Sequence, residues 1–412
     1  MNVHPFFRKK IENFPEDHQF RVIISFEDPS NRDKFIEKNK DLNILDKFYL
    51  IPSIVLNLEK KQIINYEKED SILNIEEDQK LFLSMLDVIE ILELNDYKNS
   101  QIVYTGKNVT IGIIDDGIMK GIPSITKNSR KERTRKDLYK IDDLSHGTVM
   151  ASIIKNQFKD IDDNYIGIAP NVDIIDFKIL NSNQDCYFSD VLRIFDRIEK
   201  EKIKVDILLI SLTSKSPSDG KDILSLACNL INDKGIIIVC PAGNFGPNQQ
   251  TIGSPGATDK VFTIGSLTKE LDICNFSGRG PTLDGRVKPD LCLYGSNVIV
   301  PLYHNLRVNV SGTSVSASIF VGLIVLLKEF DPTLTYNEIN ELLKKSCIDL
   351  GYEPNVQGLG TLKVTDLFKK LDLFHKKIYS YNYLIKKSLK FSIGVFIILI
   401  ILFYFVYFFR IS

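Results

Sequence analysis

The chain has 412 residues, of which 44% are apolar, so it is long enough for one large globular domain and an accessory piece. Its formal net charge of −1 at pH 7 provides no bulk attraction for nucleic acid, and no nucleic-acid partner is predicted. The six cysteines are scattered without a Cys-x-x-Cys pair, which is typical of buried free thiols and not of a metal site or a disulfide framework.

Residues 1–19 carry charges throughout and lack the apolar run of a signal peptide, so we interpret them as an N-terminal extension. Residues 20–80 alternate strand-like and helix-like segments in the order β-α-β-β-α-β, which is typical of a small ferredoxin-like α+β domain. The polar stretch Glu76–Lys80 is interpreted as an exposed connection out of this domain. The predicted strands cover Phe20–Phe26, Phe48–Pro52, Ser53–Leu58 and Ser71–Ile75, and the predicted helices cover Asn31–Lys40 and Lys60–Glu67.

From Val103 onward strands alternate with helices, which is the pattern of a parallel sheet covered on both faces. We assign residues 81–370 to this larger α/β domain. The strongly basic segment 127–136 is interpreted as a solvated surface loop. The predicted strands are Val109–Ile114, Asp173–Ile179, Asp206–Ser211, Gly235–Cys240 and Val261–Gly265, and the predicted helices are His146–Asn156, Phe188–Lys200, Lys221–Asp233, Ser314–Phe330 and Thr335–Ser346.

Residues 391–409 form an uncharged, almost wholly apolar run that is long enough to cross a bilayer as a helix. No polar face interrupts this run, which argues against a buried helix of the preceding domain. The basic segment 371–390 carries five lysines, whereas only Arg410 follows the run. Because positive residues favour the cytoplasmic side, we predict a single-pass anchor in the lipid bilayer, with the body of the protein in the cytoplasm.

Three polar residues lie where a parallel sheet places its ligands, just beyond the carboxyl ends of strands. Asp115 follows a predicted strand, while His146 and Ser314 each begin a predicted helix. A serine nucleophile needs an imidazole base, and the imidazole needs a carboxylate that fixes its tautomer. His146 alone among the five histidines lies in such a Gly-flanked junction. The three residues therefore indicate a candidate catalytic triad.

Asn244 ends a predicted strand in the sequence Pro-Ala-Gly-Asn, and its side chain would donate to a developing oxyanion together with the backbone N–H of Ser314. Taken alone, the serine-rich start of the helix at Ser314 is more typical of a helix cap. It is the combination with Asp115, His146 and Asn244 that favours a nucleophile.

With these four residues in order, the chain resembles the subtilisin-like serine proteases, the subtilase family. The resemblance covers about Gly106 to Leu367 and implies a subtilisin-like three-layer α/β fold with a mainly parallel sheet. It also implies a serine endopeptidase that hydrolyses peptide or protein substrates through an acyl-enzyme. The motifs that carry it are Ile113–Gly117, Ser145–Thr148, Pro241–Asn244 and Gly312–Ser314.

The same resemblance implies a role for each residue of the site. Ser314 would be the nucleophile, His146 the general base and then acid, and Asp115 its orienting carboxylate. Asn244 would be the oxyanion donor. The residues expected to flank the substrate are Ser211, Leu212, Thr213, Ala242 and Gly243.

The small domain at residues 20–80 resembles the family's propeptide, which assists folding and inhibits the enzyme until it is cleaved. We therefore expect an autoprocessed zymogen in which the propeptide is an intramolecular inhibitor and its end lies in the substrate cleft. Cleavage is predicted between Glu76 and Ser84. A permanently attached accessory domain is the alternative.

Several positions depart from the family pattern. Asp116 stands where the family usually has Thr or Ser, and Ser145 replaces a glycine before the histidine. Thr213–Ser214 replaces two glycines that line the cleft, which bears on specificity more than on activity. Val315–Ser318 replaces Met-Ala-x-Pro without removing a catalytic group. The segment 159–165 shows no clear calcium-loop pattern, so structural calcium is possible without a motif that supports it, and no metal or other cofactor is expected to be required.

The rival function is a catalytically degenerate protease fold that binds peptides, which the substituted cleft glycines and the altered sequence after Ser314 would fit. An ATP-dependent or metal-dependent hydrolase is excluded, because the sequence has no Walker-type loop and no His-Glu-x-x-His motif. The location also has two interpretations, since the lysine bias favours a cytoplasmic catalytic domain and the habit of the family favours an extracellular one.

Overall fold

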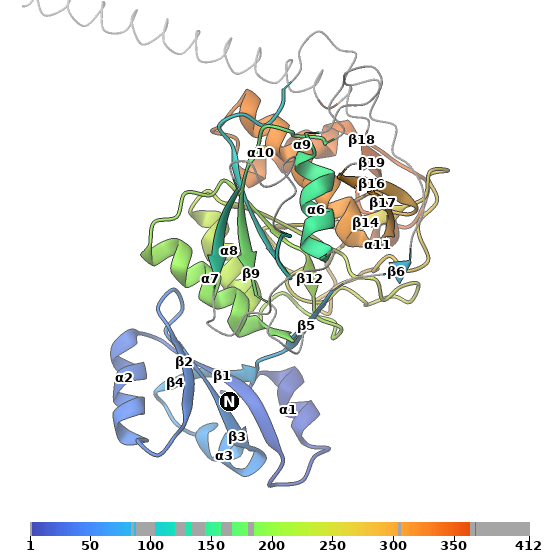
Figure 1. The fold of residues 1–412 in the computed structure, drawn as a ribbon. Helices are drawn as coiled ribbons and strands as arrows, with labels where there is room; N and C mark the ends of the chain where they lie inside the picture. Colours follow the sequence, from blue (N-terminus) through green and yellow to red (C-terminus); the bar gives the residue numbers. More distant parts are fainter. Residues whose placement is uncertain are drawn as a thin grey trace, which may run out of the picture.

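The computed structural model describes residues 2–83, 86–87, 104–119, 129–133, 145–157, 167–179, 185–303, 306–362 and 367. It shows a small N-terminal domain packed against one side of a larger α/β domain (Figure 1). Residues 371–409, which contain the predicted basic segment and membrane span, lie outside the described residues.

The small domain has the predicted β-α-β-β-α-β order and a four-stranded antiparallel sheet in the order β2-β3-β1-β4. Its central strand pairs Ile23 with Val55 on one side and Ile24 with Ile75 on the other. Helices α2 and α3 belong to the same unit. The bounds are β1 Gln19–Phe26, α2 Pro29–Lys38, β2 Ile44–Phe48, β3 Ser53–Glu59, α3 Lys60–Tyr66 and β4 Ile72–Glu77.

Both faces of β1 are buried, which explains its run of consecutive apolar residues. Val22 and Ile24 pack into the core of the small domain, whereas Ile23 belongs to a cluster formed with the larger domain. Because neighbouring side chains point to opposite faces of a strand, one face of the sheet holds its own core and the other is covered by the larger domain. Burial of apolar surface, which contributes about 25 cal/mol per Å², therefore stabilises both the small domain itself and its docking on the larger domain.

The structure differs from the sequence-based prediction at three places in this domain. The predicted N-terminal extension contains helix α1, Pro5–Ile11, whose Phe7 packs edge-on against Phe20 in the domain core. Strand β2 ends at Phe48, so the predicted strand over residues 48–52 is mostly turn. The predicted exposed connection is wrong for Glu76 and Asp78, which are both 3% exposed because they contact the larger domain.

The larger domain is built on a seven-stranded parallel sheet in the order β15-β14-β13-β11-β7-β9-β8. All five predicted strands are present, and β15 and β8 add one strand at each edge. The predicted solvated loop at 127–136 is wrong for residues 129–133, which form edge strand β8. The strand bounds are β7 Thr110–Asp115, β8 Ser129–Arg133, β9 Asp173–Lys178, β11 Ile207–Ile210, β13 Ile237–Pro241, β14 Val261–Leu267 and β15 Leu291–Tyr294.

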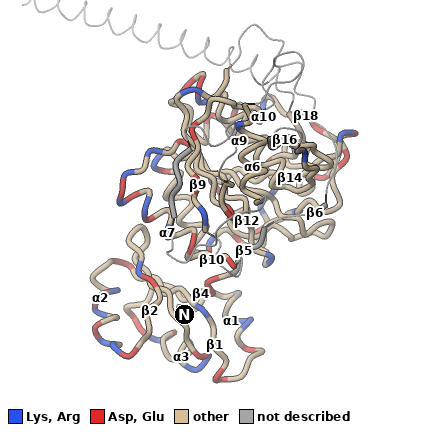
Figure 2. The backbone as a smooth tube through the Cα atoms, viewed as in Figure 1, with Lys and Arg blue, Asp and Glu red and all other residues tan. Residues whose placement is uncertain are grey.

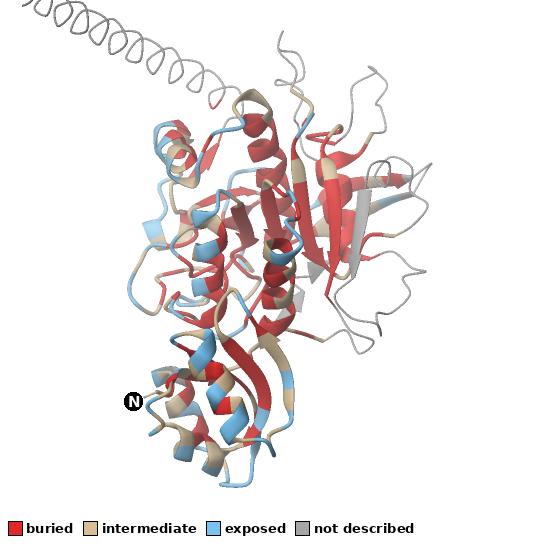
Figure 3. Ribbon diagram, turned by 90° about the vertical axis from the view of Figure 1, so that its left-hand side faces the viewer, coloured by how far each residue is buried: buried red, intermediate tan, exposed pale blue. Residues whose placement is uncertain are grey.

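Two apolar clusters cover the two faces of this sheet, so the domain has three layers. Ile111 and Ile113 of β7 pack with helices α6 and α9, whereas Ile114 packs with α7 and α8. The strands and the inner helix faces are buried in Figure 3. Charged residues of both signs alternate along the outer helix α7 (Figure 2). The helix bounds are α6 His146–Lys155, α7 Phe188–Lys200, α8 Ile223–Asp233, α9 Thr313–Phe330, α10 Tyr336–Ser346 and α11 Pro354–Gln357.

Helix α9 is the one described helix that is long and apolar enough to cross a membrane, but 89% of it is buried inside the protein. Its side chains contact strands β13, β14 and β15 and helix α6, so it is the central helix of the core. It therefore gives no evidence of a membrane span.

Three smaller sheets complete the fold. Strand β5, Lys80–Leu83, leaves the small domain and lies between β10, Cys186–Tyr187, and β12, Leu212–Thr213. Strand β6, Leu86–Asp87, pairs with β17. The remaining bounds are β16 Val298–Tyr303, β17 Leu306–Ser311, β18 Cys347–Ile348 and β19 Thr361–Leu362.

Candidate active site

The three predicted triad residues come together at the carboxyl edge of the parallel sheet. Asp115 is the last residue of β7, His146 is the first of α6, and Ser314 lies in the first turn of α9. Nδ1 of His146 lies 2.8 Å from Oδ2 and 3.0 Å from Oδ1 of Asp115. Nε2 of His146 lies 3.1 Å from Oγ of Ser314. The geometry is that of a nucleophile, a base and a carboxylate joined by hydrogen bonds.

Local capping sets the position of the histidine. Ser145 is the N-cap of α6, and its Oγ accepts from the backbone N–H of Thr148. The Ser145 hydroxyl donates to the carbonyl of Gly117 at 2.6 Å, which ties the helix start to the turn after β7. A Cβ at Gly147 would lie 2.8 Å from that same carbonyl oxygen, so glycine is needed for this close approach.

Burial and charge act in opposite directions on the triad. Burial raises the pKa of Asp115, but His146, the Ser211 hydroxyl and the N–H of Asp116 outweigh it and hold the pKa of this carboxyl below its usual range. Burial lowers the pKa of His146, yet its contacts with Asp115 and the charge of Asp116 raise that pKa overall. The imidazole is therefore a stronger base than a free histidine.

Asn244 contacts Thr313, the residue before Ser314, and one end of its amide is held there. Its Oδ1 accepts from the backbone N–H of Thr313 at 3.0 Å and from the Thr313 hydroxyl at 2.8 Å. Two donors at one atom identify that atom as the oxygen. Its Nδ2 is buried and has no hydrogen-bond partner among the described residues. This leaves a fixed donor near the start of α9, which suits an oxyanion better than a neutral ground state.

The predicted substrate-flanking residues divide into two groups. Leu212 and Thr213 form β12, and their backbone pairs antiparallel with Leu83 and Phe82 of β5, so the absence of the glycines does not prevent strand pairing. Ser211 instead directs its hydroxyl to Asp115. The other two predicted residues, Ala242 and Gly243, lie at the end of β13, where a Cβ on Gly243 would come within 3.2 Å of the Thr213 side chain.

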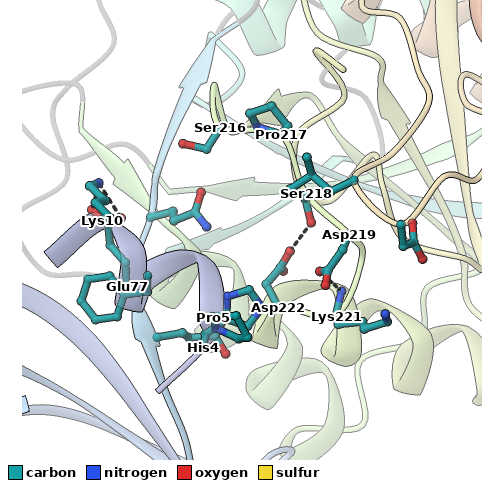
Figure 4. A pocket seen from close by; sticks show the side chains of 15 residues that line it. His4, Pro5, Lys10, Glu77, Ser216, Pro217, Ser218, Asp219, Lys221 and Asp222 are labelled. Atoms are coloured by element: carbon teal, nitrogen blue, oxygen red, sulfur yellow. Dashed lines mark hydrogen bonds and ion pairs between the residues drawn. The ribbon is translucent and has the colours of Figure 1, made fainter. Parts of the chain in front are cut away.

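A separate cavity of about 340 Å³ lies between the two domains, away from the triad (Figure 4). His4 and Pro5, at the start of α1, line one side of it, and Ser218 and Asp222 line the other. It contains none of the predicted site residues, so it is not the candidate active site.

Sequence reasoning did not assign three sets of hydrogen bonds that the structure shows. These are the two bonds from Thr313 to Asn244, the bond from Ser211 to Asp115, and the contacts of Asp116 with the backbone of α6. No local pattern distinguishes such residues, because each partner lies far away in the sequence. Among the described residues no group of three or more His, Cys, Asp or Glu side chains could hold a metal ion, and the segment 159–165 lies outside the described residues.

Comparison with known proteins agrees with the geometry. The sequence model of the subtilase family matches residues 106–367. Serine protease AprX of Bacillus subtilis is 28% identical over 406 residues, which cover 87% of this chain and 89% of that protein. The human membrane-bound transcription factor site-1 protease is 30% identical over 237 residues, which cover 55% of this chain and 21% of that protein.

The fold also matches solved structures. The epidermin leader peptide processing serine protease of Staphylococcus aureus superposes with a TM-score of 0.67 at 17% identity, covering 85% of this chain and 99% of that one. Fervidolysin of Fervidobacterium pennivorans, described as a keratinolytic enzyme related to subtilisin, gives a TM-score of 0.65 at 17% identity. The match covers 86% of this chain and 61% of that one. At this identity the match concerns the fold alone. The family match over residues 106–367 carries the conclusion: the chain belongs to the subtilase family and is a serine endopeptidase.

Proposed function

We propose that the protein hydrolyses peptide bonds through an acyl-enzyme formed on Ser314, with His146 as base and Asp115 as its orienting carboxylate. The observation that carries this proposal is the continuous hydrogen-bonded path from Asp115 through His146 to Ser314, next to Nδ2 of Asn244, which has no partner in the part of the chain that the structure describes. The reaction uses side chains and water only, so the proposal requires no cofactor.

The residues act in sequence. Oγ of Ser314 attacks the scissile carbonyl carbon while its proton passes to Nε2 of His146, and Asp115 stabilises the imidazolium through Nδ1. The carbonyl oxygen becomes an oxyanion that accepts from Nδ2 of Asn244 and from the backbone N–H of Ser314. Collapse breaks the C–N bond as His146 returns the proton to the leaving amine. Water then attacks the acyl carbonyl carbon as His146 takes its proton, and the bond to Oγ breaks as His146 returns that proton to Ser314.

We propose that the small N-terminal domain is an inhibitory propeptide, so that the protein is made as a zymogen. Strand β5 supports this, because it lies between β10 and β12 as an added strand would in a peptide-binding cleft. Polar contacts across the interface support it too. Glu76 accepts from the N–H of Ile223 at 3.0 Å, and Asp78 accepts from both the N–H and the hydroxyl of Ser189.

Strands β5 and β6 lie on either side of the proposed cleavage point, and each pairs with a strand of the larger domain. Leu83 pairs with Leu212, and Leu86 pairs with Ser311, three residues before the nucleophile. We therefore propose that autoprocessing cuts between Leu83 and Leu86, at or just beyond the C-terminal end of the range predicted from the sequence. The outcome is read directly by intact mass and N-terminal sequencing of the mature protein.

We also propose that residues 391–409 anchor the protein in a lipid bilayer, with the basic segment 371–390 at the cytoplasmic surface. The apolar run and the lysine bias support this assignment. Protease treatment of intact vesicles tests it: a catalytic domain protected in whole cells and cleaved in inside-out vesicles is cytoplasmic, and the reverse pattern would place it outside.

The catalytic proposal is tested with the full chain and a fluorophosphonate probe, which forms a covalent bond with an activated serine. We expect labelling, peptide hydrolysis and propeptide cleavage in the wild type, and loss of all three in Ser314→Ala and His146→Ala. The matched control is Ser346→Ala, a buried serine on α10 whose hydroxyl donates to Leu342, and it should retain all three activities. A folded wild type that neither reacts nor hydrolyses peptides would favour the peptide-binding alternative.

A further inference from the structure

Asp116 lies between the catalytic carboxylate and the helix that carries the catalytic histidine. Its Oδ2 accepts from the backbone N–H of His146 at 2.9 Å, and its Oδ1 accepts from the N–H of Gly147 at 2.7 Å. Asp116 follows β7, so it reaches α6 from outside the helix. Both oxygens of one carboxylate thus contact the first two residues of α6.

These contacts are distinct from ordinary capping of α6. Ser145 already occupies the N-cap position and accepts from Thr148, the third residue of the helix. The first two N–H groups of a helix remain without partners under such a cap, and Asp116 accepts both of them. His146 is consequently held twice, at its backbone by Asp116 and at its ring by Asp115. A residue with one oxygen, such as Thr or Ser, has a single acceptor atom for these two N–H groups, whereas Asp116 gives each its own.

The charge of Asp116 also bears on the imidazole. Burial and then the neighbouring charge of Asp115 raise the pKa of Asp116 to about 7, while His146 and the two backbone N–H groups oppose that rise. The groups that face it are Asp115 on β7 and His146 on α6. On the adjacent strand β9, Lys178 pairs in register with Asp115, and Asp176 accepts from the N–H of Ile118.

We propose that Asp116 is a positioning residue that holds His146 in register with Asp115 and supplies a second negative charge to the imidazolium formed during catalysis. The proposal rests on the proposed function for its catalytic meaning, but its physical core, the effect of Asp116 on the protonation of His146, is measurable without turnover. It concerns a position where this chain departs from the Thr or Ser that is usual in the family.

The first experiment is an NMR titration of the full chain in detergent micelles, with 15N-labelled histidine and Ser314→Ala to prevent self-cleavage. His146 is identified by the signal that is lost in His146→Gln. We expect Asp116→Asn and Asp116→Thr to lower the pKa of His146 by about 0.5–1 unit, because each removes a buried carboxyl group that is ionised above its own pKa of about 7 and then favours the imidazolium. An unchanged His146 titration in a folded variant would overturn the proposal.

The second experiment measures kcat/KM against pH for the same substitutions with Ser314 intact. The midpoint of the acidic limb should move to lower pH by the same amount as the pKa measured by NMR. The reason is that the imidazolium is stabilised less, so His146 loses its proton at a lower pH. A purely structural role would lower the melting temperature and leave that midpoint in place, which would contradict the proposal. If Asp116→Asn fails to fold, Asp116→Thr decides the matter, since a hydroxyl at this position is compatible with the fold in the family.

The two proposals fail in different ways. A wild-type chain that does not label with fluorophosphonate contradicts the proposed catalytic function, whereas the NMR titration still decides whether Asp116 acts on His146. Conversely, an active wild type whose His146 pKa does not respond to Asp116→Asn or Asp116→Thr leaves the endopeptidase proposal intact and overturns this one.

Discussion

The donor role proposed for Asn244 leads to a prediction in which activity and stability separate. Asn244→Leu removes both ends of the amide, whereas Asn244→Asp keeps an oxygen for Thr313 and removes only the donor. Because Nδ2 has no partner among the described residues in the free protein, its loss should leave the fold nearly unaffected and act on the transition state.

The expected magnitudes follow from the contacts. Replacing Asn244 by Leu leaves the buried N–H and hydroxyl of Thr313 without their acceptor, at about 1–3 kcal/mol each, but it also removes the amide donor that has no partner among the described residues, which costs about 1–3 kcal/mol. These terms partly cancel, so the free energy of unfolding should fall by about 1–3 kcal/mol. For activity we adopt the roughly 10²–10³-fold loss in kcat, or about 2.7–4 kcal/mol, reported for the removal of such a donor in subtilisin, a member of this family.

The assay is hydrolysis of a chromogenic peptide by the processed enzyme, with urea unfolding of the same preparations. Both variants should lower kcat with little change in KM, and Asn244→Asp should be at least as impaired as Asn244→Leu, because its carboxylate repels an oxyanion. A matched substitution that leaves the site untouched is Asn229→Asp on α8. If Asn244→Leu keeps kcat within a few-fold of the wild type, the oxyanion assignment is wrong.

Two further predictions concern the interface and the core. Burial and then the charge of Asp222 raise the pKa of Glu76, so docking of the small domain is strongest at low pH and weakens as the pH rises through that value. Size-exclusion chromatography measures release of the processed small domain, and Glu76→Gln should make that release less dependent on pH. Release that does not change with pH in the wild type would refute the predicted weakening at high pH. Phe320 is fully buried edge-on against Phe262, so Phe320→Ala should lower the free energy of unfolding by about 3–5 kcal/mol, whereas the exposed Leu226→Ala should change it by less than about 1.

Local patterns were sufficient where a residue's role depends on its neighbours in the sequence. Helix α7 begins and ends where the sequence predicts, since its apolar residues repeat at helical spacing, its first turn holds an acidic residue and its last turn holds basic ones. The five predicted strands of the parallel sheet were equally clear because burial on both faces gives them largely continuous apolar runs. Strand β8 was missed because an edge strand tolerates charged residues that read as a loop.

Long-range contacts decided the rest. Glu76 and Asp78 read as solvated residues in the sequence and are buried only because the larger domain presents Ile223 and Ser189 to them. Helix α1 was similarly hidden, since Phe7 becomes a core residue only through its contact with Phe20.

For the candidate active site, the sequence by itself identified the residues that the proposed chemistry uses, because Asp115, His146, Ser314 and Asn244 each lie near a strand end or helix start that a parallel sheet brings to one edge. Only the tertiary structure decided how they are held. Thr313 leaves one end of the Asn244 amide free, and Asp116 fixes the backbone of His146. The physical reason is that a hydrogen bond depends on distance and direction in space, and the sequence specifies these only after the chain has folded.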